Sequence, residues 1–322
     1  MRWMMLLLCL GALTLAHAGA KTWEEAYHLD ASYREAERAV QTATDDLAKA
    51  KADPEAAPLT VTRAEEKLTE AQAGVRNAKV QTTVKVLTAV GDLLTARRRA
   101  AASEAHATQA HLSATAAKIR ADAGMASAQE LARAKEDAAA ADGSLAAANR
   151  ELQGALDRVH LYVDTPPDAL PPLPVQEIAG TALGDHVTLI TAKDRVSEAK
   201  RTLALAQGPD TAALDRTAGE RALKSAEDAL DDAQRVLKDG VETAKRRYHT
   251  AVEGEGTTAE ALKLAQADVK TAQKRFDAGA ISQLALQQAV AALRDAEAAR
   301  EQAAVERWLS HLGLIQAVGG AL

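Results

Sequence analysis

The 322-residue chain is predicted to be all-α, and three observations lead to this class. Only 2% of its residues are aromatic and 8 are Pro, whereas 47% are hydrophobic and 26% charged, a composition that favours helices over strands. Apolar residues recur at intervals of three and four over long segments, which is the spacing of helices that pair along narrow stripes. In addition, the first half of the chain recurs in the second half, which predicts two tandem copies of one helical unit.

The duplication keeps nearly one offset along three successive segments. The turn sequence that contains Gly124 and Ser127 recurs around Gly279 and Ser282, 155 positions later. The apolar stripes that recur are Ala36, Val40, Ala43, Leu47 and Ala50 as Ala192, Val196, Ala199, Leu203 and Ala206, and Leu68, Ala71, Val75 and Ala78 as Leu223, Ala226, Leu230 and Ala233.

Residues 1–18 are predicted to be a secretory signal peptide. Arg2 precedes a short apolar stretch from Trp3 to Leu15, and small residues at Ala16 and Ala18 form the exit that a signal peptidase recognises. We expect cleavage after Ala18, and an uncleaved amino-terminal anchor is the alternative. The only cysteine lies in this segment, so the mature chain would form no disulfide and no thiolate metal site.

Residues 19–163 are predicted to be the first three-helix repeat, residues 164–174 a Pro-rich linker, and residues 175–322 the second repeat. Five prolines between positions 166 and 174 exclude a helix or a central strand from the linker. We expect Gly254 and Gly256 to kink or locally unwind the long helix of the second repeat. The expected helices run from Thr22 to Lys51, Thr62 to Asp122, Ser127 to Tyr162, Val175 to Gln207, Ala218 to Asp277 and Ser282 to Val318.

The stripes alternate a large aliphatic residue with Ala, which lets two antiparallel helices approach closely as a coiled coil. Such a narrow seam buries little apolar surface on each helix, and few aromatic residues are present to enlarge the core. We therefore expect the chain to associate with copies of itself.

Composition and motifs argue against an enzyme or a nucleic-acid-binding protein. The net charge is −6, and acidic and basic residues are interspersed, so no basic stripe is available for phosphates. The histidines are scattered, and His106 and His111 are five positions apart, which places them on different helix faces. No metal-ligating, nucleophile or phosphate-binding motif occurs, so no cofactor, metal or catalytic residue is predicted.

Several segments of the mature chain resemble the TolC family of outer-membrane efflux proteins. They are TWEEA at 22–26, SYREAERAV at 32–40, the turn RFDAGAIS at 275–282 and the Pro-rich joint between homologous halves. The resemblance implies a homotrimer whose twelve helices enclose a tunnel across the envelope, working with a periplasmic adaptor and an inner-membrane pump. It also implies an exported protein of the periplasm that is associated with the outer membrane.

One departure from that family lies in the connections between the first and second helix of each repeat. A membrane-crossing hairpin needs more than about twenty residues of alternating polarity. The connections here, Ala52–Val61 and Gly208–Thr217, are shorter and do not alternate. The sequence therefore predicts a TolC-like helical tunnel domain without a β-barrel, whose membrane association depends on partners.

Two helix turns are the candidate functional site. By the resemblance, the turns dock the adaptor, and an acidic residue six places after the glycine constricts the tunnel mouth. That place is Glu130 in the first repeat and Ala285 in the second. A helix stop by Gly and a cap by Ser also explain these residues without any partner. The predicted docking residues are Gly124, Met125, Ala126 and Ser127 with Gly279, Ala280, Ile281 and Ser282.

Two functions remain open from sequence alone. The first is a conduit of an envelope efflux or export system that docks a periplasmic adaptor. The second is a coiled-coil scaffold or spacer of the cell envelope through which no solute passes.

Overall fold

The computed structural model describes residues 30–53, 57–170, 183, 186–207 and 213–319. These residues form six helices and no strand, so the predicted all-α class is confirmed. The expected signal peptide and most of the expected linker lie outside the described residues. The helices are α3 (Ala31–Ala52), α4 (Pro58–Asp122), α5 (Ala128–His160), α6 (Val187–Leu205), α7 (Ala213–Asp277) and α8 (Gln283–Ala317).

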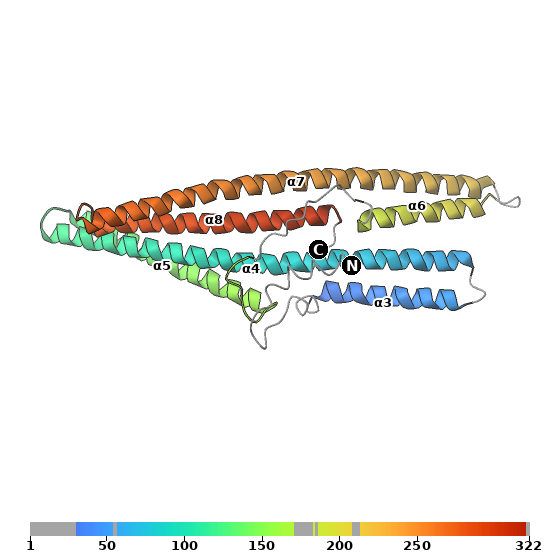
Figure 1. The fold of residues 1–322 in the computed structure, drawn as a ribbon, viewed down its shortest axis with the longest axis horizontal. Helices are drawn as coiled ribbons and strands as arrows, with labels where there is room; N and C mark the ends of the chain where they lie inside the picture. The colour runs from blue at the N-terminus through green and yellow to red at the C-terminus, as the bar shows by residue number, and fades with distance from the viewer. Residues whose placement is uncertain (1–29, 54–56, 171–182, 184–185, 208–212, 320–322) are drawn as a thin grey trace.

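The helices form an elongated wall of four lanes (Figure 1). The long helices α4 and α7 have 65 residues each and so are about 98 Å long. The shorter helices α5 and α3 follow one another along one side of α4, while α8 and α6 follow one another between α4 and α7. The lane order is therefore α3 with α5, α4, α6 with α8, and α7, and among the described residues α7 and the α3–α5 lane form the two free edges.

The two halves of the wall repeat the same unit. Helix α7 begins and ends 155 positions after α4. The first residues are Pro58 and Ala213, and the last residues are Asp122 and Asp277. Both helices begin four to five residues before the predicted starts at Thr62 and Ala218. In α4 this earlier start is explained by Pro58 in the first turn, where the missing N–H is not needed and the fixed φ is already helical.

The expected unwinding near Gly254 is wrong, because α7 is helical without interruption from Ala213 to Asp277. The hydroxyl of Thr258 donates to the carbonyl of Gly254 at 3.1 Å. Glu255 is held by the neighbouring helix, since Arg307 of α8 donates to its carboxylate at 2.6 Å. The contact of Glu255 with α8 comes from outside the helix and offsets the low helix propensity of the glycines.

Helices α6 and α3 are described from later residues than the predicted starts at Val175 and Thr22. Helix α6 begins at Val187, where the Nδ1 of His186 accepts from the backbone N–H of Thr188 at 3.2 Å. The expected helical stretch from Val175 lies mostly outside the described residues. Helix α3 begins after Asp30, whose carboxylate accepts from the Ser32 N–H at 2.9 Å, and the expected start at Thr22 is also outside them.

The largest buried side chains gather at mid-height of the wall. Val90 and Leu93 of α4 pack with Val159 at the end of α5, and Leu87 packs with Leu312 of α8. Towards both ends the buried residues are mainly Ala, as the alternating stripes predict. Within the described part of the chain, no helix combines the length and the apolar character that crossing a bilayer requires.

Candidate functional site

The two predicted turns lie together at one end of the wall, where α4 passes into α5 and α7 into α8 (Figure 1). In the first turn Gly124 has a φ of 73°, a left-handed conformation that side-chain-bearing residues adopt only at a cost. The N–H of Met125 donates to the carbonyl of Arg120 at 2.8 Å, and that of Gly124 to Ala121 at 2.9 Å. This paired closure is the Schellman motif.

The second turn has the same construction. Gly279 has a φ of 69°, the N–H of Ala280 donates to the carbonyl of Arg275 at 2.7 Å, and that of Gly279 to Phe276 at 2.8 Å. Ser282 then caps α8 by accepting from the N–H of Ala285 at 3.2 Å. The stop-and-cap interpretation therefore describes the local structure of both turns, and docking stays a prediction.

The turn end exposes apolar side chains. Met125 is 73% exposed, Ile119 is 64% exposed in the last turn of α4, and Phe276 of α7 is 36% exposed. Ala126 and Ile281 of the two turns are partly buried. Exposed apolar side chains contribute to a contact surface for another protein where they gather into one patch.

Glu130 is engaged within its own turn. Its carboxylate accepts from the Ser127 N–H at 2.7 Å, while the Ser127 hydroxyl accepts from the Glu130 N–H at 3.1 Å, which completes a capping box. The hydrogen bond from the Ser127 backbone lowers the pKa of Glu130. The side chain is thus an ionised cap, and its role as a tunnel-mouth acid stays a prediction.

Two histidines connect the lanes near this end. His106 of α4 contacts Asp295 of α8 at 2.9 Å, and His111 contacts Asp142 of α5 at 2.9 Å. They therefore face opposite neighbours, in line with their spacing of five. Sequence reasoning missed both partners because each carboxylate comes from another helix, 31 positions away for Asp142 and 189 positions away for Asp295.

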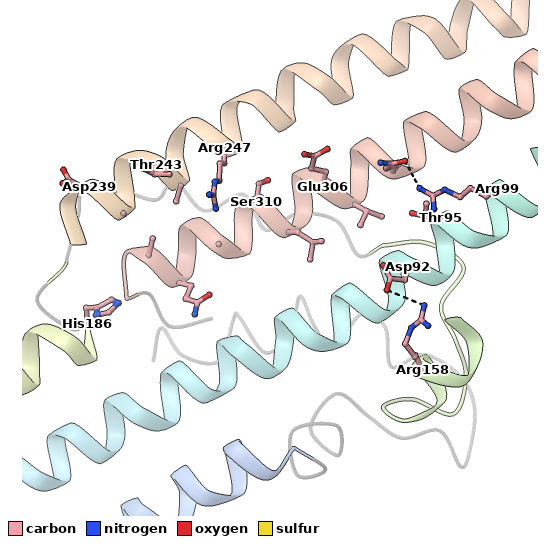
Figure 2. A pocket seen from close by; sticks show the side chains of 18 of the residues that line it. Asp92, Thr95, Arg99, Arg158, His186, Asp239, Thr243, Arg247, Glu306 and Ser310 are labelled. Atoms are coloured by element: carbon pink, nitrogen blue, oxygen red, sulfur yellow. Dashed lines mark hydrogen bonds and ion pairs between the residues drawn. The ribbon is translucent and has the colours of Figure 1, made fainter. Parts of the chain in front are cut away.

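A groove of 1120 Å³ runs along one face of the wall at mid-height, between α4 and α5 on one side and α7 and α8 on the other (Figure 2). Arg158 pairs with Asp92 at 3.7 Å and Arg99 with Glu151 at 3.2 Å on its α4–α5 side. Its other side carries polar side chains of α7 and α8. These include Asp239, Thr243, Arg247, Glu306 and Ser310.

The groove and the residues that follow α5 lie on different faces of the wall. Arg97 donates to the carboxylate of Asp168, at 3.1 Å, and so points toward the chain that leaves α5. Arg99, two residues and about 200° further around α4, lines the groove. The groove face is therefore not covered by that segment. Sequence analysis did not predict this groove, because its residues come from four helices.

Comparison with known proteins shows which solved structures share this architecture. No protein-family model matches the chain, and no characterised protein is significantly similar to it in sequence. Solved structures are similar: a membrane protein from Pseudomonas aeruginosa has a TM-score of 0.67 at 16% identity, with 93% of this chain and 89% of that one covered. The outer membrane protein VceC from Vibrio cholerae has a TM-score of 0.65 at 14% identity, with 93% and 95% covered. The Campylobacter jejuni CmeC outer membrane channel has a TM-score of 0.62 at 12% identity, with 97% and 91% covered.

The fold is therefore that of the outer-membrane channel proteins. Similarity at this level of identity shows a shared fold, and the predicted resemblance to the TolC family is confirmed in that respect. Of these three structures, that of CmeC is described as an outer membrane channel. Within the described residues, no three His, Asp or Glu side chains come together as metal ligands.

Proposed function

We propose that the protein is a TolC-like component of an envelope efflux or export system. The observation that carries the proposal is the four-lane wall, which matches outer-membrane channels over more than nine-tenths of the chain. In the part of the chain that the structure describes, one such wall has a free edge on each side and encloses no channel. A conduit therefore requires several copies, and the resemblance implies three, with twelve helices around one channel.

The polar groove supports a role in solute passage. A surface that faces water in a conduit has to be polar, and Arg247 and Glu306 offer charged side chains of both signs along the groove. We propose that this face lines the channel and that the face crossed by residues 163–170 lies outside.

The turns at the end of the wall are the proposed docking site for a periplasmic adaptor, with an inner-membrane pump behind it. Their rigid Schellman closures and the exposed Met125 and Phe276 support this assignment. The end of a tube is also the part that a coaxial partner can reach. Export to the periplasm and attachment to the outer membrane through partners complete the proposal.

The mass of the signal-free protein in solution tests the conduit directly. Multi-angle light scattering should give three times the protomer mass, and electron microscopy should show a hydrated central channel. Cells that lack the protein should retain a fluorescent export substrate that complemented cells release. A monomer, or a trimer with a solid centre and normal export without it, would instead support the envelope scaffold.

A further inference from the structure

The free edges of the wall are copies of an internal junction. Inside the protomer, α4 packs with one side against α3 and with the other against α6. Since α3 corresponds to α6 and α4 to α7, the outer side of α7 corresponds to the side of α4 that packs on α6. Likewise the outer side of α3 corresponds to the side of α6 that packs on α4. The two edges of the protomer are therefore the two halves of this junction, presented without their partners.

Polar pairs hold the internal junction together. Arg201 of α6 donates to both carboxylate oxygens of Glu66 of α4, at 2.9 and 2.7 Å. The hydroxyl of Thr191 donates to the carboxylate of Glu70 at 2.8 Å. These contacts fix the register of α6 on α4.

A third pair, Arg63 of α4 with Glu198 of α6, belongs to the same junction. The hydrogen bonds from Arg63 and Arg201 lower the pKa of Glu198, although burial opposes this. The hydrogen bond from Arg201 lowers the pKa of Glu66 in the same way. Both carboxylates are therefore ionised partners at neutral pH.

The same positions on the free edges carry complementary residues with the roles exchanged. An offset of 155 takes Glu66 to Arg221 on α7, and an offset of 156 takes Arg201 to Asp45 on α3, so a Glu–Arg pair becomes an Arg–Asp pair. All of the corresponding edge residues are exposed.

The two residues of the hydrogen-bonded pair, and those of the second ion pair, also change together. Glu70 becomes Ser225 and Thr191 becomes Glu35, so the donor and the acceptor exchange helices. The third pair is lost from both sides together, since its positions hold Ala218 and Thr42. In none of the three pairs is one member left facing an unsuitable partner.

We propose that the α7 edge of one copy binds the α3 edge of the next copy, with Arg221 paired to Asp45 and Ser225 to Glu35. This inference rests on the proposed function, since it assumes that copies close into a ring. The exchange of charge also gives specificity, because an incoming α3 edge brings Asp45, which Glu66 of the internal junction would repel. The α7 edge of one copy therefore pairs with the α3 edge of the next copy, and the incoming edge does not displace α6 from the internal junction.

At mid-height the corresponding positions on the two edges are not complementary, and a residue there serves as the control for the seam. The internal contact of Gly91 with Val305 corresponds to Arg246 opposite Arg150, so like charges face each other there. The specific contacts of the seam are therefore concentrated at its α3 end, and replacement of Arg246 should not weaken the assembly.

Charge reversal tests the seam. Asp45→Arg and Arg221→Asp, each alone, should shift the concentration for assembly upward by about tenfold, as measured by light scattering on a dilution series. The double variant should return it to within about threefold of wild type. The matched control Arg246→Asp should leave assembly unchanged or strengthen it.

Cross-linking tests the same contact without reversing a charge. The only native cysteine, Cys9, is absent from signal-free protein, so Asp45→Cys with Arg221→Cys introduces the only thiols. A short bismaleimide should then yield covalent trimers, while Arg246→Cys with Asp45→Cys should not.

The outcomes separate the two proposals. Monomeric wild-type protein would overturn both the conduit and the seam. A wild-type trimer that the single reversals leave intact, or that the double reversal does not restore, would overturn the seam alone. Far-UV circular dichroism on each variant checks that helicity is kept.

Discussion

Replacement of Gly91 by alanine tests how the two repeats pack on each other. This glycine lies in α4 where α8 crosses closely, and a Cβ built on it would be 2.5 Å from Cγ1 and 3.3 Å from Cγ2 of Val305. Val305 is β-branched and has little freedom to rotate away in a helix. The added methyl group therefore has to push the helices apart.

The size of the effect follows from two opposing contributions. Alanine is more favourable than glycine in a helix interior by about 1 kcal/mol. Overpacking a close contact costs about 1–3 kcal/mol. Gly91→Ala should thus change the free energy of unfolding by between about zero and 2 kcal/mol in the destabilising direction.

Gly143 provides the matched comparison. It is an exposed residue of α5, and a Cβ there would meet no atom within 4 Å, so Gly143→Ala should stabilise by about 1 kcal/mol. Thermal and urea unfolding followed by circular dichroism measure both variants. Val305→Ala should be better tolerated in the Gly91→Ala background than in wild type. An equal gain from the two glycine replacements would refute the close approach of α4 and α8.

Three further predictions concern ionisation and the turns. Burial opposes it, but the hydrogen bond from Lys85 at 2.6 Å helps to lower the pKa of Asp30 to about 2. The resulting stabilisation of roughly 2 kcal/mol is present above pH 4 and is lost as the pH falls toward 2. Asp30→Asn should remove this acid-sensitive part of the free energy of unfolding, measured at a series of pH values. Burial lowers the pKa of His311, which is 4% exposed, so wild-type stability should fall as the pH drops below 6.5 and His311→Phe should flatten that dependence in thermal melts. Replacement of Gly124 or Gly279 by Val should leave helicity nearly unchanged but weaken pull-down of a cognate adaptor, and unchanged pull-down by both variants would refute docking at the turns.

Features that depend on local sequence could be predicted. The glycine stops at 124 and 279 and the serine caps at 127 and 282 are read from neighbouring residues, and the structure places both turns as predicted. The helix periods also follow from local spacing, which is why the class and the number of described helices agree.

Features that depend on lane order could not be predicted in the same way. The partners of Arg201 and His106 lie 135 and 189 positions away in the chain, and the groove joins four helices. The failure at Gly254 has the same origin: the propensity of the segment is low, but Glu255 is anchored by a residue of α8. Long-range contacts decided these points, and one sequence contains no record of which lanes are neighbours.

Salt provides a last distinction between two ways in which the wall could assemble. If copies met through apolar stripes alone, association would be insensitive to moderate salt or would strengthen in sulfate. If Arg221 and Asp45 pair across an exposed seam, sodium chloride should weaken association, because the screening length falls from about 10 Å at 0.1 M to about 3 Å at 1 M. The double reversal keeps the pair and should keep this dependence, whereas Asp45→Asn with Arg221→Gln should reduce it. Light scattering measures the salt dependence of wild type, the double reversal and the neutralised double variant. Of these, only the neutralised variant lacks the ion pair, so an equal salt dependence in all three would show that the pair does not contribute to assembly.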